Sequence, residues 1–306
     1  MNTKYLIKKC ITVLTTLSIL LGTFGGVSVF AQSVNYAKAD FDGASAPEGT
    51  YQGMTFAYKI SKGNKIGKLS LSKSDVPYYG TMLRFDQTGS NASNDNLQFM
   101  TFTLDEGIPY GENAPANTYA EFSADIKLQN RKTGVNIELS NSTMGMTAYT
   151  YRLNIRANGE LFSNNVSTGV FAPSGTNSVV NNLRIRMDLN KKAVVGIYVD
   201  DELVVDSFTS PLPTNAVTYD KIDVVKICIG NKTSTDSLYV DNVNVVTYTS
   251  DDGTTPIGSK AELKSKLDEI DTSSLTDEQK SVFDEAVLMA KNPIATQEEI
   301  DAMVLA

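Results

Sequence analysis

The stretch Asn182-Leu-Arg-Ile-Arg-Met-Asp-Leu-Asn190 decides the fold class, because its apolar and polar side chains alternate without a break. The apolar members share one face of an extended chain: Leu183, Ile185, Met187 and Leu189. Strict alternation of this kind is the pattern of a β-strand with one buried face. Asn190-Lys191-Lys192 then predicts a turn, and Ala193–Val199 predicts the returning strand of an antiparallel hairpin.

The same period of two recurs on both sides of this hairpin. Further runs alternate in the same way: Glu121–Leu128, Gly134–Ser140, Tyr149–Arg156, Leu203–Phe208, Val224–Gly230 and Leu238–Tyr248. The pair Asn158-Gly159 predicts a two-residue type I′ hairpin turn, whose two central positions need positive φ. No long helical pattern separates the runs, so we expect antiparallel pairing. About ten to fourteen short strands in residues 32–250 predict one β-sandwich.

After Thr249 the hydrophobic period changes from two to near 3.6. Residues 251–258 are rich in Asp, Gly and Thr and contain a proline, which predicts a linker. Capping-box sequences then predict three helices in residues 259–306, beginning at Ser259–Glu262, Thr276–Gln279 and Thr296–Glu299. The third helix has room for only about ten residues, so either the bundle is marginal or the chain is a fragment of a longer protein. We favour the fragment.

Residues 1–31 have the pattern of a secretory signal peptide. Three lysines precede an apolar run from Cys10 to Val29, and Ala31 is the small residue before the expected cleavage. Several glycine, serine and threonine residues dilute the run, which argues against an uncleaved membrane anchor. We therefore expect a secreted or cell-surface protein that is not membrane-bound after cleavage.

The composition excludes several kinds of chemistry. The 306 residues contain no histidine, which excludes Ser-His-Asp catalysis and histidine-ligated metals. Of the 2 cysteines only Cys228 remains after cleavage, so no intramolecular disulfide can form. Its apolar surroundings predict a buried thiol. The net charge of −8 argues against nucleic acid as a partner.

The central hairpin resembles those of concanavalin A-like and laminin G-like jelly-roll modules, whose second strand usually ends in Val-Asp-Gly. Here Asp201 stands in the place of that glycine. Ser237–Val243 is similar to the last strand of such modules, and Asp40–Gly43 is similar to their first strand. The resemblance covers residues 38–248 and implies a mainly β fold, an antiparallel jelly-roll β-sandwich.

The C-terminal residues resemble the FIVAR-type helical module of secreted Gram-positive glycosidases and adhesins. The matching stretches are Leu275–Gln279, Glu285-Ala286 and Asn292–Ala302. The third helix of that family continues further, which favours the fragment. Together the resemblances imply a non-catalytic accessory region of a bacterial cell-surface or secreted carbohydrate-active protein, with further domains as partners.

Four predicted strands carry polar side chains on their second face, and they form one binding surface if they share a sheet. We expect a glycan to be bound there by Arg152, Asn154, Arg184 and Arg186. The alternative is the solvated outer face that antiparallel sheets usually have. The platforms for sugar rings would be Tyr78 and Tyr79, with Tyr110 second, because tryptophan is absent.

Three aspartates are candidates for a structural calcium site. Asp40 and Asp42 precede the first predicted strand of the module, and Asp241 lies in the last. These strands are often neighbours in sandwiches, so the carboxylates could converge on Ca²⁺, which prefers hard oxygen ligands. The resemblance implies the same, because similar modules often hold calcium there. The alternative is two aspartates in a turn and one at a strand edge.

The leading interpretation is an exported, non-catalytic carbohydrate-binding module. The second is an enzyme on the same face, a polysaccharide lyase or glycoside hydrolase that uses Tyr151 with Arg152, or Glu121 with Asp125. Glu269-Ile-Asp271 only partly matches the Glu-x-Asp-x-x-Glu pattern of glucanases, because the third carboxylate is missing. The third interpretation is a structural or adhesin spacer domain.

Overall fold

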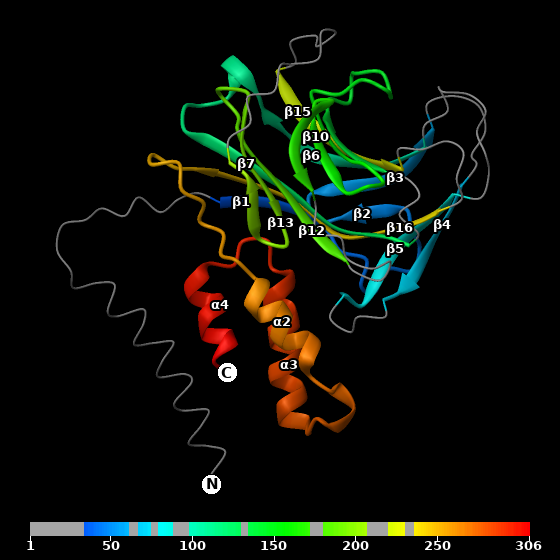
Figure 1. Ribbon diagram of the computed structural model, residues 1–306, viewed down its shortest axis with the longest axis vertical. Coiled ribbons are helices and arrows are strands. Elements are labelled where there is room, and N and C mark those ends of the chain that lie inside the picture. Colours follow the sequence, from blue (N-terminus) through cyan, green and yellow to red (C-terminus); the bar gives the residue numbers. More distant parts are fainter. Residues whose placement is uncertain are drawn as a thin grey trace, which may run out of the picture. The chain divides into compact units, whose positions relative to one another are not determined.

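The computed structural model describes residues 34–60, 67–74, 79–87, 98–129, 134–171, 180–206, 220–229 and 236–306. The predicted signal peptide and Tyr78 lie outside these residues. The described part of the chain forms two antiparallel sheets followed by three α-helices (Figure 1). None of the helices described is long and apolar enough to cross a membrane.

The first sheet contains β1 (Val34–Ala39), β4 (Gly67–Lys73), β5 (Thr81–Gln87), β7 (Thr118–Leu128), β12 (Asn181–Asp188), β13 (Ala193–Val199), β14 (Glu202–Val205) and β16 (Asp236–Thr249). Its strand order is β14-β13-β12-β7-β16-β5-β4, and β1 pairs with the C-terminal half of β16. The first and last strands are therefore neighbours, as predicted. Asp40 and Asp42 follow β1 instead of preceding it, because the chain enters the sheet earlier than the sequence pattern indicated.

The second sheet contains β2 (Gly49–Tyr51), β3 (Met54–Ile60), β6 (Gln98–Pro109), β8 (Val135–Ser140), β9 (Tyr151–Ile155), β10 (Glu160–Ser163), β11 (Val166–Phe171) and β15 (Lys221–Ile229), in the order β11-β10-β9-β8-β15-β6-β3-β2. The predicted β9–β10 hairpin is confirmed, but its type I′ turn is wrong. Of its turn residues only Gly159 has positive φ, and its N–H donates to the carbonyl of Arg156. Two other turns have two consecutive positive φ values, Asn164-Asn165 between β10 and β11 and Asp200-Asp201 between β13 and β14.

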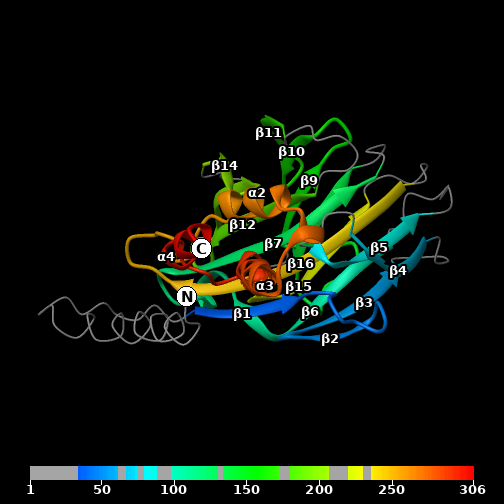
Figure 2. The same ribbon diagram turned by 90° about the horizontal axis from the view of Figure 1, so that it is seen from below.

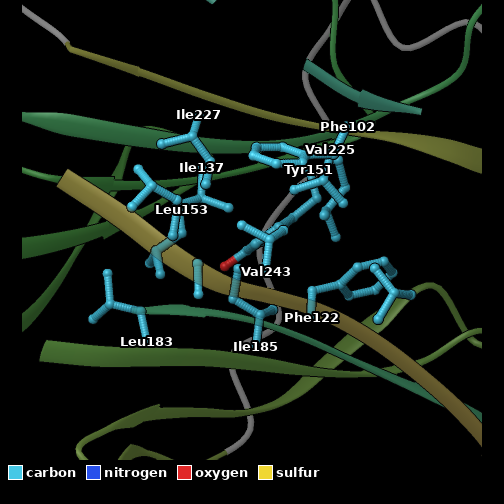
Figure 3. Packing of buried hydrophobic residues seen from close by; sticks show 14 of the residues in the cluster. Phe102, Phe122, Ile137, Tyr151, Leu153, Leu183, Ile185, Val225, Ile227 and Val243 are labelled. Atoms are coloured by element: carbon cyan, nitrogen blue, oxygen red, sulfur yellow. The ribbon is translucent and has the colours of Figure 1, made fainter. Parts of the chain in front are cut away.

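The core lies between the inner faces of the two sheets. Leu183 and Ile185 of β12 and Phe122 of β7 meet Ile137 and Leu153 of the second sheet there (Figure 3). Each such side chain stabilises the fold by roughly 1.5–3 kcal/mol when it is fully buried. The apolar side chains of the alternating pattern therefore point into the core between the sheets. The predicted fold class, an antiparallel jelly-roll β-sandwich with C-terminal helices, is confirmed.

The helices are α2 (Ala261–Glu269), α3 (Asp277–Lys291) and α4 (Gln297–Val304), with short 3-10 turns η2 (Gly111–Asn113) and η3 (Thr272–Ser274). The capping boxes at Thr276 and Thr296 are confirmed. The box predicted at Ser259 is wrong, because Lys260 is the N-cap and its side chain does not cap the helix. Acceptors from elsewhere in the fold replace the box: Asp201 Oδ2 accepts from Lys260 N–H, and Gln297 Oε1 accepts from Ser259 N–H, both at 2.9 Å.

The three helices pack on each other and on the outer side of the first sheet (Figures 1 and 2). Leu263, Phe283 and Ile300 come from the three helices, and their apolar cluster includes Tyr79 and Met82 from the sandwich. The helices therefore cover polar side chains on the outer side of the first sheet and leave the outer side of the second sheet uncovered.

Candidate functional site

The four polar strand faces form two separate surfaces. β7 pairs with β12 in the first sheet, and β8 pairs with β9 in the second. Arg184 and Arg186 therefore lie on the outer side of one sheet, and Arg152 and Asn154 lie on the outer side of the other. The condition for one shared surface is therefore not met, because the chain crosses to the second sheet between β7 and β8.

On the first sheet, both predicted arginines are held by buried partners. Arg184 Nη1 lies 2.9 Å from Glu121 Oε2, and Arg186 Nε donates to the hydroxyl of Tyr248 at 2.7 Å. The same hydroxyl donates to Glu121 Oε1 at 2.8 Å. Burial, and then the charge of Glu121, raises the pKa of Tyr248. This network leaves little of either guanidinium to meet a ligand.

The C-terminal part of the chain covers this surface. Arg186 Nη2 donates to the carbonyl of Gly253, and Ile257 packs beside the ring of Tyr248. Lys264 of α2 lies 3.8 Å from Asp125 of β7. The outer face of the first sheet was expected to be either a binding surface or solvated. It is instead an intramolecular contact surface, covered by the C-terminal part of the chain.

A small polar cavity of about 30 Å³ remains between the sheet and the helices. Three buried atoms that line it have no hydrogen-bond partner in the described structure: Arg184 Nε, Asn242 Oδ1 and Asn244 Oδ1. Burial, and then the charge of Lys264, lowers the pKa of Lys260 to about 8 at the same cavity. Bridging water is the usual partner of such atoms.

The outer face of the second sheet carries a buried ion triad. Arg152 Nη2 and Nε lie 2.6 and 2.9 Å from Glu138 Oε1. Lys226 Nζ lies 2.9 Å from Glu138 Oε2 and also donates to the carbonyls of Met146 and Ala148. The carboxylate of Glu138 is fully buried. Glu138 therefore fixes the position of Arg152 from below.

Beside this triad the same strand borders an open hollow. Asn154, Arg156 and Asn158 line it, and its volume is about 450 Å³. The guanidinium of Arg152 lies over the ring of Tyr149 at 3.8 Å, and that of Arg156 lies over the ring of Phe162 at 3.6 Å. The pattern of period two already placed Arg156 on this face. The sequence did not indicate the aromatic partners, because only the folded structure brings the rings of Tyr149 and Phe162 to these arginines.

The two predicted aromatic platforms that the structure describes, Tyr79 and Tyr110, have buried rings. Tyr79 and Tyr110 are each 3% exposed. Tyr79 packs into the apolar cluster beneath the helices, and Tyr110 packs into the main core. Desolvation raises the pKa of Tyr110 to about 12. Both residues lie outside the strands, and the sequence could not show that their side chains turn inward.

The three predicted aspartates do converge, but on a lysine. Lys291 Nζ lies 2.5 Å from Asp42 Oδ2 and 3.8 Å from oxygens of both Asp40 and Asp241, and it donates to the carbonyl of Tyr79 at 3.2 Å. Burial raises the pKa of Asp241 well above its usual value, against the opposing effect of Lys291.

Calcium does not fit this arrangement. It needs six to eight oxygens at about 2.3–2.6 Å, and the ammonium of Lys291 stands at the point where they would meet. Among the described residues no group of three or more acidic, cysteine or histidine side chains has a spacing that would hold a metal ion.

The residues considered for catalysis do not form an accessible catalytic pair. Tyr151 points into the core, where burial raises the pKa of its hydroxyl, so it does not share a surface with Arg152. Glu121 and Asp125 lie beneath the C-terminal cover. Asp271 accepts from the N–H of Ser273 and begins a 3-10 turn.

No protein-family model matches the sequence, and no curated protein is significantly similar to it. Among solved structures it is similar to a sialidase, with 11% identity and a TM-score of 0.45 over 85% of this chain and 25% of that one. The family 11 carbohydrate-binding module from Clostridium thermocellum, in complex with a mixed-linked tetrasaccharide, matches with 12% identity and a TM-score of 0.37 over 71% and 96%. Lectin UEA-II complexed with galactose matches with 10% and 0.42 over 70% and 98%. The chain thus spans about a quarter of the sialidase, and at these identities the likeness concerns the fold alone.

Proposed function

We propose that this chain is an exported, non-catalytic carbohydrate-binding module of a bacterial cell-surface or secreted protein, and that it binds its glycan on the outer face of the second sheet. The observation that carries the proposal is the row of Arg152, Asn154 and Arg156 on one side of β9 and its turn, beside an open hollow. The outer face of the first sheet is covered by the chain itself. The second sheet therefore offers the accessible polar surface.

The chemistry of this row suits sugar hydroxyls. A guanidinium offers several N–H donors in one plane, and the amide oxygen of Asn154 offers an acceptor, since the nitrogen of this amide already donates to Asn136 Oδ1. Sugar hydroxyls both donate and accept, so they can pair with either group. The rings of Tyr149 and Phe162 beneath the two guanidiniums restrict their rotation, which lowers the entropy lost on binding.

The row also favours an acidic glycan. Glu138 already neutralises Arg152, but Arg156 is exposed and makes no ion pair with any residue that the structure describes. A free guanidinium binds a carboxylate with two parallel hydrogen bonds. We therefore expect a glycan that contains uronate residues to bind more tightly than its neutral counterpart.

The export part of the proposal rests on the N-terminal sequence and has its own test. Expression of the full chain in a Gram-positive host should release a protein into the medium whose first residue is Gln32. Retention in the cells with Met1 intact would contradict export without bearing on glycan binding.

The binding site is tested with purified residues 32–306, titrated calorimetrically with a polyuronate oligosaccharide and a neutral one. Arg156→Ala should weaken binding of the acidic ligand at least about tenfold, as expected for the loss of a charged hydrogen bond. Arg84→Ala is the matched control, because Arg84 is a partly exposed arginine of the first sheet, paired with Asp86. Equal effects of the two changes, or no binding of either oligosaccharide, would refute the site.

A further inference from the structure

Lys291 ends α3, and its side chain leaves the helix for the sandwich. The side chain is 4% exposed, and its ammonium lies among four oxygens of the sandwich. Three are carboxylate oxygens of Asp40, Asp42 and Asp241, and one is the backbone carbonyl of Tyr79. A buried ammonium usually meets one carboxylate, so this number of oxygens is unusual for an ion pair.

The oxygens come from three separate parts of the chain and are held by the backbone. Thr81 N–H donates to Asp42 Oδ1 at 2.6 Å, and Phe41 N–H donates to Asp241 Oδ1 at 3.4 Å. Gly80 has φ +61°, and a Cβ there would collide with the carboxylate of Asp42. The cage therefore belongs to the sandwich, whereas the cation within it belongs to the helices.

We infer that Lys291 serves as the structural cation of this cage, in the position that a divalent metal would take. Its ammonium joins the end of β1, the start of β5 and the middle of β16, and it couples that junction to the docked helix α3. Lys38 supplies a second positive charge at 3.0 Å from Asp40. Three carboxylates face two lysines, so the loss of Lys291 leaves a cage with excess negative charge and hard oxygens.

This assignment separates two substitutions that a plain salt bridge would not separate. Lys291→Ala removes the charge and leaves space that a hydrated Ca²⁺ can fill. Lys291→Met removes the same charge but keeps an unbranched side chain in the space. Lys280→Ala removes an exposed lysine of the same helix, paired only with Asp284 among the described residues, and controls for the net charge of the protein.

The test measures the melting temperature of residues 32–306 and the three variants in EDTA and in 10 mM CaCl₂. The wild type and Lys280→Ala should melt at the same temperature in both solutions. Both Lys291 variants should melt roughly 5–10 °C lower in EDTA, because buried carboxylates lose their partner. Calcium should restore at least half of that loss to Lys291→Ala and little to Lys291→Met.

Terbium luminescence, excited through the nearby tyrosines, gives an independent readout of the metal. It should appear with Lys291→Ala and be weak with the other three proteins. A wild type that loses stability in EDTA would overturn the assignment, because a metal would then already be the cation. Failure of Lys291→Ala to recover in calcium, or to fold in either solution, would also overturn it, since a metal should replace the ammonium.

Discussion

Glu138→Gln tests how much the buried ion triad on the second sheet contributes to stability, because it removes one charge from the centre of the triad and keeps the shape of the side chain. Glu138 lies between Arg152, at 2.6 Å, and Lys226, at 2.9 Å. The side chain of Lys226 is 3% exposed and that of Arg152 is 18% exposed. After the substitution both cations remain, without the carboxylate with which both are paired.

The expected cost follows from these exposures. Breaking a buried ion pair by removing one partner costs about 3–5 kcal/mol, since the remaining charge stays buried. Arg152 reaches water at its edge and recovers part of its solvation, so we expect a loss near the lower end, about 3 kcal/mol. For a chain of this size that corresponds to a fall in melting temperature of roughly 6–12 °C.

Urea unfolding followed by circular dichroism would measure the loss, with an unchanged m-value as evidence of the same two-state transition. Glu160→Gln is the control, because this glutamate belongs to the same sheet but accepts from Ser167 at an exposed position. It should cost less than about 0.5 kcal/mol. A double-mutant cycle with Lys226→Met should give a coupling of about 1–3 kcal/mol. A loss below about 1 kcal/mol for Glu138→Gln would refute the argument that the triad is buried and coupled.

Three further predictions concern other parts of the molecule. The pKa of Lys260 is lowered to about 8 in the folded protein, against about 10.4 in the unfolded chain. Between these two values the unfolded chain binds more protons, so the free energy of unfolding should rise with pH. Measured from pH 7 to 10, this rise should be present in the wild type and absent from Lys260→Met. Burial raises the pKa of Cys228 to about 12, so at pH 8 the thiol should react with a disulfide reagent only after urea unfolds the protein, and rapid reaction of the native protein would contradict its burial. Thr276→Ala should cost about 1 kcal/mol in a urea titration through the loss of its capping box, whereas Ser259→Ala should cost much less, because Ser259 Oγ accepts only one long hydrogen bond, from Ala261 N–H at 3.4 Å, and the shorter bonds there are accepted by Asp201 and Gln297.

The strands could be predicted because alternation is a local signal that burial of one face imposes directly. β12 and β13 appear in the structure where Leu183–Leu189 and Ala193–Val199 predicted them. The sheet to which a strand belongs is a non-local property. Nothing in Val135–Ser140 indicates that it leaves its neighbour β7 and pairs with β15, so the sequence could not decide whether the four polar faces share a sheet.

The failed helix cap has a similar cause. Ser259 and Glu262 have the spacing of a capping box, but such a box operates only when no better acceptor is near. The fold brings Asp201 to the N–H of Lys260. Asp201 is also the residue that departs from the Val-Asp-Gly pattern, so the departure in the sequence and the missing cap are two aspects of one contact.

The same reasoning explains why a correctly identified polar face on the first sheet was not a binding surface. A period of two shows that a side chain points away from the core, but it does not distinguish water from another layer of protein. The chain after Ser250 has 13 acidic and 5 basic residues, yet three of its lysines face the sandwich: Lys260, Lys264 and Lys291. Lys260 and Lys264 are four residues apart and so lie on one side of α2. A few lysines gathered toward an acid-bearing sheet, within an otherwise acidic segment, indicate that the segment itself covers that sheet, and the search for a ligand then moves to the face that has no such cover.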